Sequence, residues 1–417
     1  MFPWQEMIQL MIGGVVAVYG EPMFWMVVML ITYQYWQLQK SQQRMFGLKT
    51  FSLSHQVTMT VFLGSFGGVV GSFLLTMLGV DVNQLGLGYI WPVAILLMAI
   101  NMRYLCFAYA GGLVAMSKVL FGWPVVDVPQ LLVLVAVLHI TESILIGISG
   151  QYGSMPVILR RANGRLVGAF NLQNFWPLPL ILMSAVTVPE ANITAGMLNM
   201  PEWWPLLPAT TVAPEGYQWM YVMIPVVAAL GYTDVAIASS PARRRCKSAM
   251  YLAIYSILLL GLALLSVKYR WLQIFAAIAS PLGHELLIQL DIRRELEGTP
   301  LYVPPLHGVM VLDTVIDSPA YKAQLKPGDI LLNFHGVSVD NPSQLAAALA
   351  GAPPKFVLEF MRNGRFLQHK MSLAKEEPRL GVILVPNGNE LQYIELAEDK
   401  ILLWEWFKKK IGKNNKQ

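Results

Sequence analysis

The sequence predicts an α-helical polytopic membrane bundle followed by a small α+β domain. Hydrophobic residues make up 55% of the 417 residues and charged residues only 13%, against roughly a quarter in ordinary globular chains. The charges are also unevenly distributed, because residues 1–283 hold 23 charged side chains and the much shorter segment 284–417 holds 32. A membrane part followed by a soluble part accounts for both observations.

The excess of positive charge lies in the predicted membrane part, where 14 Lys and Arg residues outnumber 9 Asp and Glu residues. These cations stand in short loops between apolar runs, where Lys and Arg set the orientation of a membrane protein. The basic balance of the chain therefore indicates membrane topology, and we expect no nucleic-acid partner.

Apolar runs predict about six to nine membrane crossings, since a transmembrane helix needs about 20 mostly apolar residues. The clear candidates are residues 10–33, 57–79, 128–148, 218–238 and 248–267. Shorter or proline-marked candidates are residues 88–102, 104–121, 175–189 and 271–283. Proline ends or kinks a helix, and the prolines in or beside these shorter runs are Pro92, Pro177, Pro179 and Pro281.

The basic loops predict which side of the protein faces the cytoplasm. Their cations are Lys40, Arg44, Lys49, Arg160, Arg161, Arg165, Arg243, Arg244, Arg245 and Lys247. By contrast, residues 190–217 contain three Glu residues and no Lys or Arg. We therefore expect the basic loops and the C-terminal domain in the cytoplasm and the loop 190–217 outside. Lys268 and Arg270 fit this arrangement less well.

Residues 308–373 carry an ordered series of strand and turn signals. The residues Asp340–Ser343 cap a helix that runs to about Ala350, because Asp, Asn and Ser side chains satisfy the free N–H groups of a helix start. Asn363-Gly364 is a strong signal for a hairpin. The predicted strands are residues 308–312, 330–332, 355–361 and 366–373.

Four short motifs in this segment together resemble bacterial PDZ domains. They are Gly308–Val311, Ser318–Ala320, Pro327–Leu331 and His335–Val339. Two residues depart from the pattern of that family. Gln324 stands where Gly is usual before the Pro-Gly-Asp turn, and His335 stands where Asn is usual. Both lie in turns, so the departures concern local geometry.

The resemblance implies a peptide-binding groove. A PDZ domain binds an extended peptide at a sheet edge, and backbone N–H groups capture its carboxylate. The best match to the capturing loop and its strand is Leu380, Gly381, Val382 and Ile383, with Leu306–Val309 as a second candidate. The facing helix would present Ser343, Leu345, Ala346 and Leu349. In the alternative interpretation, Gly381 merely starts a final core strand.

These observations divide the chain into four segments. They are a transmembrane helical domain at 1–283, a membrane-proximal linker at 284–300, a PDZ domain at 301–390 and a basic amphipathic tail at 391–417. Within Asp399–Lys413, apolar residues surround and precede three lysines. Two interpretations stay open, an interfacial helix on an anionic leaflet or a helix packed against the PDZ domain.

Four ionisable residues lie within predicted spans: Glu21, His139, Glu142 and Asp234. Such residues are costly in a membrane and suggest function by default, and His139 and Glu142 share one helical face. Together the four could form a proton path or a metal site. The plainer interpretation is that they satisfy one another or line the interior of the bundle.

His284-Glu285 is similar to the start of the H-E-x-x-H zinc motif of membrane metalloproteases. Ile288 stands where the second His is required, so the motif indicates a polar hinge at the membrane surface. Cys106 lies in an apolar run and Cys246 in a basic loop, so neither indicates a disulfide or a zinc site. We therefore expect no catalytic residue, no metal ion and no cofactor.

Two overlapping GxxxG patterns occupy one predicted span. They are formed by Gly64 with Gly68 and by Gly67 with Gly71. Small residues at this spacing let two helix backbones approach closely. The pattern predicts a partner helix, either in the same chain or in a second copy of it.

Three segments of the membrane part, followed by the PDZ domain, resemble one family over most of the chain. They are Arg103–Gly112, Leu138–Glu142 and Gly168–Pro177. In this order they resemble the MinJ-type division-topology proteins of Gram-positive bacteria. The resemblance implies a multi-pass protein of the bacterial cell membrane that bridges a polar scaffold (DivIVA) and the MinD-based inhibitor of septum formation.

Three functions follow as hypotheses. The first is a non-enzymatic membrane scaffold whose cytoplasmic PDZ domain binds protein partners in division-site selection. Such a scaffold would also contact membrane lipids, and it could form a homo-oligomer. The second is a regulatory subunit or sensor of a membrane protease, and the third is a small-solute or proton transporter. A scaffold should tolerate His139→Ala and fail when Gly381 or Leu380 is altered, whereas a transporter should show the reverse.

Overall fold

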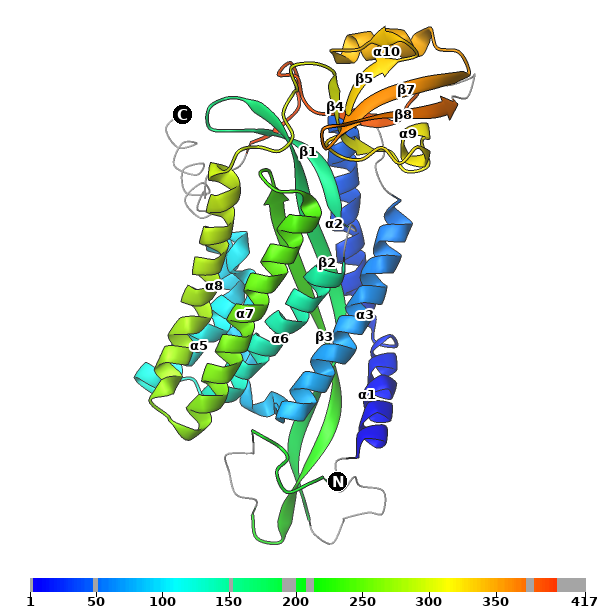
Figure 1. Cartoon of the computed structure of the whole chain (residues 1–417). Helices are drawn as coiled ribbons and strands as arrows, with labels where there is room; N and C mark the ends of the chain where they lie inside the picture. Colours follow the sequence, from blue (N-terminus) through cyan, green and yellow to red (C-terminus); the bar gives the residue numbers. More distant parts are fainter. Residues whose placement is uncertain are drawn as a thin grey trace, which may run out of the picture.

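The computed structural model describes residues 3–47, 52–149, 153–189, 200–207, 214–372 and 379–395. These residues form a helical part built around a long β-hairpin, followed by a sheet-rich C-terminal region at one end (Figure 1). The helices of the first part are α1 Trp4–Val18, α2 Pro22–Phe46, α3 Leu53–Leu78, α4 Leu87–Ile100, α5 Phe107–Phe121, α6 Val128–Ile148, α7 Pro241–Lys268 and α8 Leu272–Glu297. Two short 3₁₀ helices, η1 Val82–Gln84 and η2 Met102–Leu105, connect them.

Three helices in the described part of the chain, α3, α6 and α7, are long and apolar enough to cross a membrane. Helices α1 and α2 meet the same criteria as a pair, although the chain bends by 66° between them. Many apolar side chains on the outer helix faces are exposed, including Leu30 at 58% and Leu258 at 67%. These three to four apolar helices fit membrane association.

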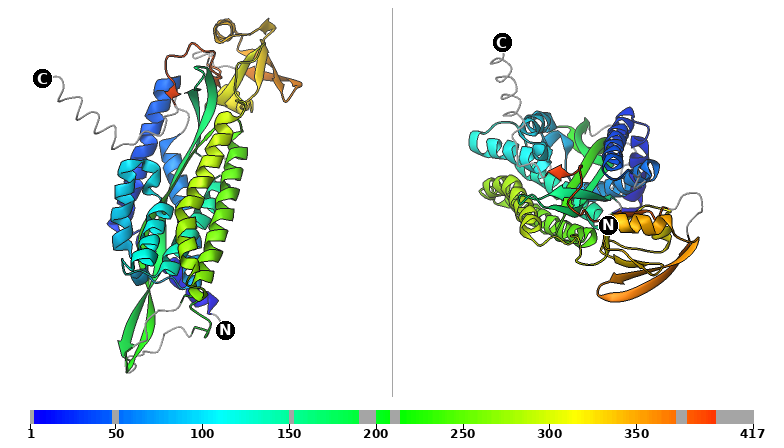
Figure 2. Two further views of the ribbon diagram at one scale, coloured as in Figure 1. Left: turned by 90° about the vertical axis from the view of Figure 1, so that its left-hand side faces the viewer. Right: turned by 90° about the horizontal axis from the view of Figure 1, so that it is seen from above.

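Two of the nine predicted spans are strands, and their assignment as helices was wrong. The runs 175–189 and 218–238 fall in β2 Leu166–Pro189 and β3 Tyr217–Ala236, which pair antiparallel from Phe170–Ala236 to Pro189–Tyr217. A buried strand and a buried helix give equally apolar sequences, so hydropathy alone does not separate them. Figure 2 shows this hairpin passing between the helices and projecting beyond them, away from the C-terminal region.

Along the part of β2 that has no strand on its outer side, backbone N–H groups donate to helix side chains, and prolines stand where an N–H group would have no acceptor. The Phe175 N–H donates to the Tyr35 hydroxyl (3.0 Å), and the Ile181 N–H donates to the Ser72 hydroxyl (2.8 Å). Pro177 and Pro179 stand between them and have no N–H to satisfy. An unpaired backbone group away from water is costly, so this edge suits a strand enclosed by apolar helices.

One of the two GxxxG pairs on α3, Gly64 with Gly68, packs against this strand and not against a helix, whereas Gly67 of the other pair contacts Leu145 of the neighbouring helix α6, as the pattern predicts. A Cβ atom on Gly64 would lie 2.2 Å from the Pro177 carbonyl oxygen, and one on Gly68 would lie 2.4 Å from that of Pro179. Both distances are far shorter than van der Waals contact, so glycine is required for α3 to reach the backbone of β2.

Helix α8 continues without a break through residues 284–297, which the sequence assigned to a linker. The predicted hinge at His284 and Glu285 therefore lies inside a helix. At the end of α8, one Glu295 carboxylate oxygen accepts from the N–H groups of Ile237, Ala238 and Ser239. The helix is thus fixed to the turn that joins β3 to α7.

The C-terminal region contains a sheet of strand order β8-β7-β5-β4-β9, with β6 paired to β5. Its elements are β4 Val309–Thr314, α9 Pro319–Lys322, β5 Ile330–Phe334, β6 Val337–Ser338, α10 Pro342–Ala350, β7 Lys355–Arg362, β8 Arg365–Ser372 and β9 Val382–Leu384. The strands β4, β5, β7 and β8 lie where the sequence predicts strands. Asn341 caps α10 by accepting from the Gln344 N–H (2.8 Å), as its sequence signal predicts.

The two parts of the chain are joined by strand pairing. Strand β10 Ile394–Glu395 adds in parallel to β1 Ser154–Arg160, which itself pairs with β2. The Gly168 N–H of β2 also donates to the Tyr302 carbonyl (2.9 Å), and the Tyr302 ring packs edge-on against Phe170. The long hairpin therefore continues from the helical part into the base of the C-terminal region.

Candidate functional site

The first candidate site is the outer edge of β9, the last strand of the C-terminal sheet. Strand β9 pairs antiparallel with β4, from Val311–Leu384 to Thr314–Val382. Among the described strands, β9 has no partner on its other side. A strand edge with free N–H and C=O groups is a template for pairing with another extended segment.

The loop before β9 has the geometry of a tight turn. Gly381 has a φ of +74°, a conformation that favours glycine, and a Cβ at this position would lie 2.2 Å from the Ser318 Cβ. The carbonyl of Leu380 accepts from the Ala320 N–H (3.0 Å), and that of Gly381 accepts from the Val315 N–H (2.9 Å). Within the described residues, the N–H groups of Leu380 and Gly381 donate to no backbone carbonyl.

The predicted groove residues are distributed between surface and core. Ser343 and Ala346 on α10 are exposed, and Leu349 is half-buried. Leu345, in contrast, is 3% exposed and packs in the core of the C-terminal region together with Leu380. The structure therefore brings Leu380 and Leu345 together as core residues, leaves Ser343 and Ala346 exposed, and leaves Leu349, Gly381 and Val382 half-buried.

The second candidate loop, Leu306–Val309, leads into an interior strand. Val309 starts β4, which has β5 on one side and β9 on the other. The Gly308 N–H already donates to the Asp340 carboxylate (2.9 Å). This loop therefore opens onto no free strand edge, and the geometry favours the loop at Gly381.

Strand β9 belongs to two hydrophobic cores at once. Val382 and Leu384 pack against the core of the C-terminal region, whereas Ile383 belongs to the large core of the helical part. Side chains of a strand alternate between its two faces, so this three-residue strand holds the C-terminal region on the long hairpin. The open edge is therefore fixed relative to the helices.

Asp313 is the titratable group behind β9, opposite Ile383 on strand β4. Burial raises the pKa of the Asp313 carboxyl to about 6, and the hydrogen bond from the Thr314 N–H partly offsets this shift. Burial, with the nearby Asp313 charge as a second cause, raises the pKa of Tyr302 to about 12. The joint between the two parts therefore contains a carboxyl group that titrates near pH 6.

The four ionisable residues predicted within spans do not form one site. Glu21 is exposed at the bend between α1 and α2, where it precedes the first residue of α2. Glu142 lies one turn from His139 on the same helix, α6. His139 is 2% exposed. The prediction of a single proton path or metal site through all four residues therefore finds no support in their positions.

Asp234 on β3 belongs to a separate buried ion-pair network around Arg244. The Arg244 guanidinium donates to Asp234 (2.7 Å) and to Asp291 (2.7 Å), and all three side chains are less than a tenth exposed. The Ser248 hydroxyl lies 2.9 Å from an oxygen of each carboxylate. These contacts join β3, α7 and α8. The predicted basic loop at 243–247 thus lies in the first two turns of α7, where Arg244 is buried.

His139 instead faces two residues that the sequence placed outside any site. Its Nε2 atom lies 3.2 Å from the Cys106 Sγ, and the His284 Nε2 lies 3.8 Å from the same sulfur. Next to them, the Glu285 carboxylate accepts from Arg103 (2.7 Å) and from the Tyr109 hydroxyl (2.6 Å). No local motif signals this cluster, because Cys106 is 33 residues from His139 and 178 from His284.

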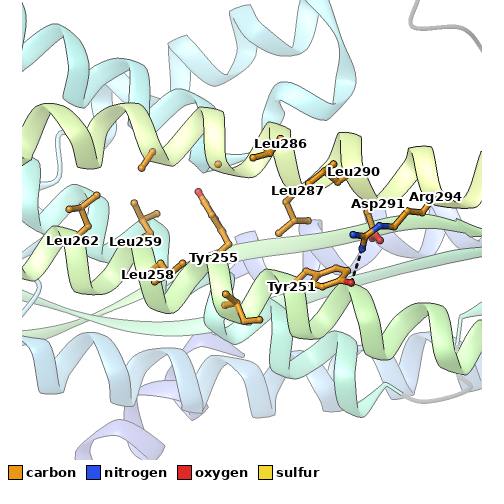
Figure 3. A pocket seen from close by; sticks show the side chains of 13 residues that line it. Tyr251, Tyr255, Leu258, Leu259, Leu262, Leu286, Leu287, Leu290, Asp291 and Arg294 are labelled. Atoms are coloured by element: carbon orange, nitrogen blue, oxygen red, sulfur yellow. Dashed lines mark hydrogen bonds between the residues drawn. The ribbon is translucent and has the colours of Figure 1, made fainter.

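An apolar crevice runs between α7 and α8 (Figure 3). Leu258, Leu262 and Leu286 line it, and at one end Arg294 donates to the Tyr251 hydroxyl (2.7 Å). Tyr255 lines the same crevice, and its ring also packs edge-on against His139 and His284. Tyr255 therefore separates the crevice from the Cys106 cluster.

These features define a membrane-associated protein with a helical part built around a β-hairpin and a sheet-rich C-terminal region. No protein-family model matches the chain. A relative from Bacillus subtilis (strain 168), named cell division topological determinant MinJ, is 23% identical over 396 residues. The similarity covers 89% of this chain and 94% of that protein. This similarity over most of both chains supports a MinJ-like family.

Proposed function

We propose that this chain is a non-enzymatic membrane adaptor that recruits protein partners in division-site selection. Its C-terminal region would be a PDZ domain on the cytoplasmic side of a multi-pass membrane part. The observation that carries the proposal is the open edge of β9 directly after the Gly381 loop. The similarity to MinJ, over most of both chains, supports the division role.

Recruitment would proceed by strand addition. An extended peptide segment of a partner would pair with the free edge of Val382–Leu384, and its carboxylate would accept from the N–H groups of Leu380 and Gly381. The carbonyls of these two residues are already held by Ala320 and Val315, so the loop is fixed before the peptide arrives. A preformed loop lowers the entropy cost of binding.

The test is localisation and partner recovery in dividing cells that carry a fluorescently tagged chain. The wild type should gather at septa or poles, and division proteins should copurify with it after cross-linking. Gly381→Glu should still insert in the membrane but lose those partners, because the new side chain collides with Ser318 and adds a negative charge where a carboxylate binds.

Gly364→Glu is the matched control for this substitution. Gly364 has a φ of +76°, close to that of Gly381, but it lies in the β7–β8 turn and a Cβ there would meet nothing within 4 Å. Gly364→Glu should keep the partners. A uniform membrane distribution of the wild type, together with normal division when the gene is deleted, would overturn the proposal.

A further inference from the structure

The cluster of Cys106, His139 and His284 has the composition and spacing of a metal site. One donor atom from each residue lies within 4.8 Å of the other two. Zn–S bonds of about 2.3 Å and Zn–N bonds of about 2.0–2.1 Å place tetrahedral donor atoms about 3.5 Å apart. The two distances from the Cys106 Sγ, 3.2 Å to His139 and 3.8 Å to His284, lie on either side of that value.

The surroundings of His139 favour the tautomer that binds metal. Its Nδ1 atom lies 2.7 Å from the Val135 carbonyl oxygen. A carbonyl can only accept, so Nδ1 carries the hydrogen and Nε2 has a free lone pair directed at the cluster. Histidine ligands in metalloproteins are typically oriented by this kind of bond from the second ring nitrogen.

The surroundings of Cys106 suit an anionic sulfur ligand. Cys106 precedes α5, and its Sγ accepts from the Ala108 N–H (3.4 Å) at the start of that helix. The partial positive charge of a helix N-terminus attracts negative charge. His284 on α8 directs its Nε2 atom toward the same sulfur, at 3.8 Å, and so brings a third donor to the cluster.

We infer that Cys106, His139 and His284 bind a zinc ion, which would join the start of α5 to α6 and α8. One thiolate and two imidazoles are ligands that zinc accepts readily. Among the described residues, the cluster offers three protein donors, so a water or another small ligand would complete a tetrahedron. The rings of Tyr109 and Tyr255 pack edge-on against His284 and enclose the site.

The inference is tested on the full-length chain, purified in detergent with a tag that contains no histidine. Zinc is measured by mass spectrometry, and the metal-free protein is titrated with Co²⁺, whose thiolate bond gives a charge-transfer absorption. Wild type should hold one zinc ion per chain and develop the absorption. Cys106→Ser, His139→Ala and His284→Ala should each lose at least about 10-fold in metal affinity.

Cys246→Ser and His307→Ala are the matched controls and should keep the metal. Cys246 is exposed on α7, and the His307 side chain is 87% exposed. A wild-type chain that binds neither Zn²⁺ nor Co²⁺, or a Cys106→Ser variant that keeps full zinc content, would overturn the inference.

Alkylation of Cys106 gives a test that needs no disruptive variant. The chain has two cysteines, so Cys246→Ser leaves Cys106 as the single thiol. Added Zn²⁺ should then slow labelling by a maleimide reagent, because a coordinated thiolate is not free to react. Equal labelling rates with and without Zn²⁺ would contradict the site. None of these measurements depends on partner binding, so they stand apart from the proposed adaptor role.

Discussion

The Ser72 hydroxyl lies 2.8 Å from the backbone nitrogen of Ile181, so a helix side chain takes the place of a neighbouring strand at the edge of β2. The same hydroxyl donates to the Gly68 carbonyl (2.6 Å) on its own helix. Ser72 therefore uses both its donor and its acceptor capacity. This contact, like the one from the Phe175 N–H to the Tyr35 hydroxyl, satisfies a backbone group of the 24-residue strand β2 where no neighbouring strand is paired with it.

Replacing Ser72 with Ala should destabilise the protein by about 1–3 kcal/mol, because it leaves the buried Ile181 N–H without an acceptor. The measurement is the thermal unfolding of the detergent-solubilised chain. Ser256→Ala is the control, since Ser256 is equally buried but donates only to the Leu252 carbonyl of its own helix. If both variants unfold at the same temperature, Ser72 does not support the strand edge.

The same edge shows why the sequence predicted the helical part only in part. Helices α3, α6 and α7 were expected, since a long apolar run suffices to define them. Strands β2 and β3 were not, because nothing in an apolar run states whether its N–H groups bond within the run or to another segment. The prolines at 177 and 179 were interpreted as helix ends, although they mark a strand edge that needs no donor.

The candidate sites differ in how far the sequence could locate them. The loop at Gly381 carries a local pattern, and the structure places it before an open strand edge. The Cys106 cluster has no local pattern, because the 3₁₀ turn at residues 102–105, α6 and α8 meet only in the folded chain. Leu345 was assigned to the groove because helix periodicity cannot show which face meets the core.

The ion pair of Arg244 with Asp291 should contribute strongly to the attachment of α8 to α7. Asp291→Ala leaves the guanidinium with one fewer buried partner, and removal of one member of a buried pair typically costs about 3–5 kcal/mol. Thermal unfolding of the solubilised chain measures the effect. Glu297→Ala on the same helix breaks only the exposed pair with Arg293 and should change little. Equal effects of the two variants would contradict a structural role for the buried pair.

Stability should fall as pH rises from about 4 to about 6, through the titration of Asp313. Its folded pKa of about 6 lies above its ordinary value of 3.8, so the folded state binds the proton more tightly than the unfolded state. The stabilisation by the protonated carboxyl is complete below pH 3.8 and is lost as pH passes 6. The difference of about two units corresponds to about 3 kcal/mol.

Asp313→Asn should remove this dependence and leave the protein more stable at neutral pH. The free energy of unfolding of wild type and variant is compared across pH 4–8. The contributions of the other carboxyl groups then cancel in the difference between the two proteins. Asp317→Asn serves as the control, because Asp317 is exposed and asparagine tolerates its φ of +65°. A pH profile that Asp313→Asn leaves unchanged would place the titrating group elsewhere.

Gln324 and His335, the two departures from the PDZ pattern, both have positive φ angles. Gln324 has a φ of +56° and His335 a φ of +51°, a conformation that costs most L-residues roughly 1–2 kcal/mol. Gln324→Gly should therefore stabilise the protein, by about 0.5–1 kcal/mol after the extra freedom of glycine in the unfolded chain is subtracted. The Gln324 carbonyl, which accepts from Arg362 (2.8 Å), remains in place in this variant.

The neighbouring residue gives the control for this gain. Ala323 has a φ of −77°, where glycine relieves no strain, so Ala323→Gly should lower the unfolding temperature while Gln324→Gly raises it. The two substitutions lie side by side in one turn. Changes of opposite sign in the unfolding temperature would therefore show that the backbone conformation, and not a change in burial, causes the gain. If Gln324→Gly also lowers the unfolding temperature, the Gln324 side chain makes a stabilising contact that outweighs the strain of its backbone.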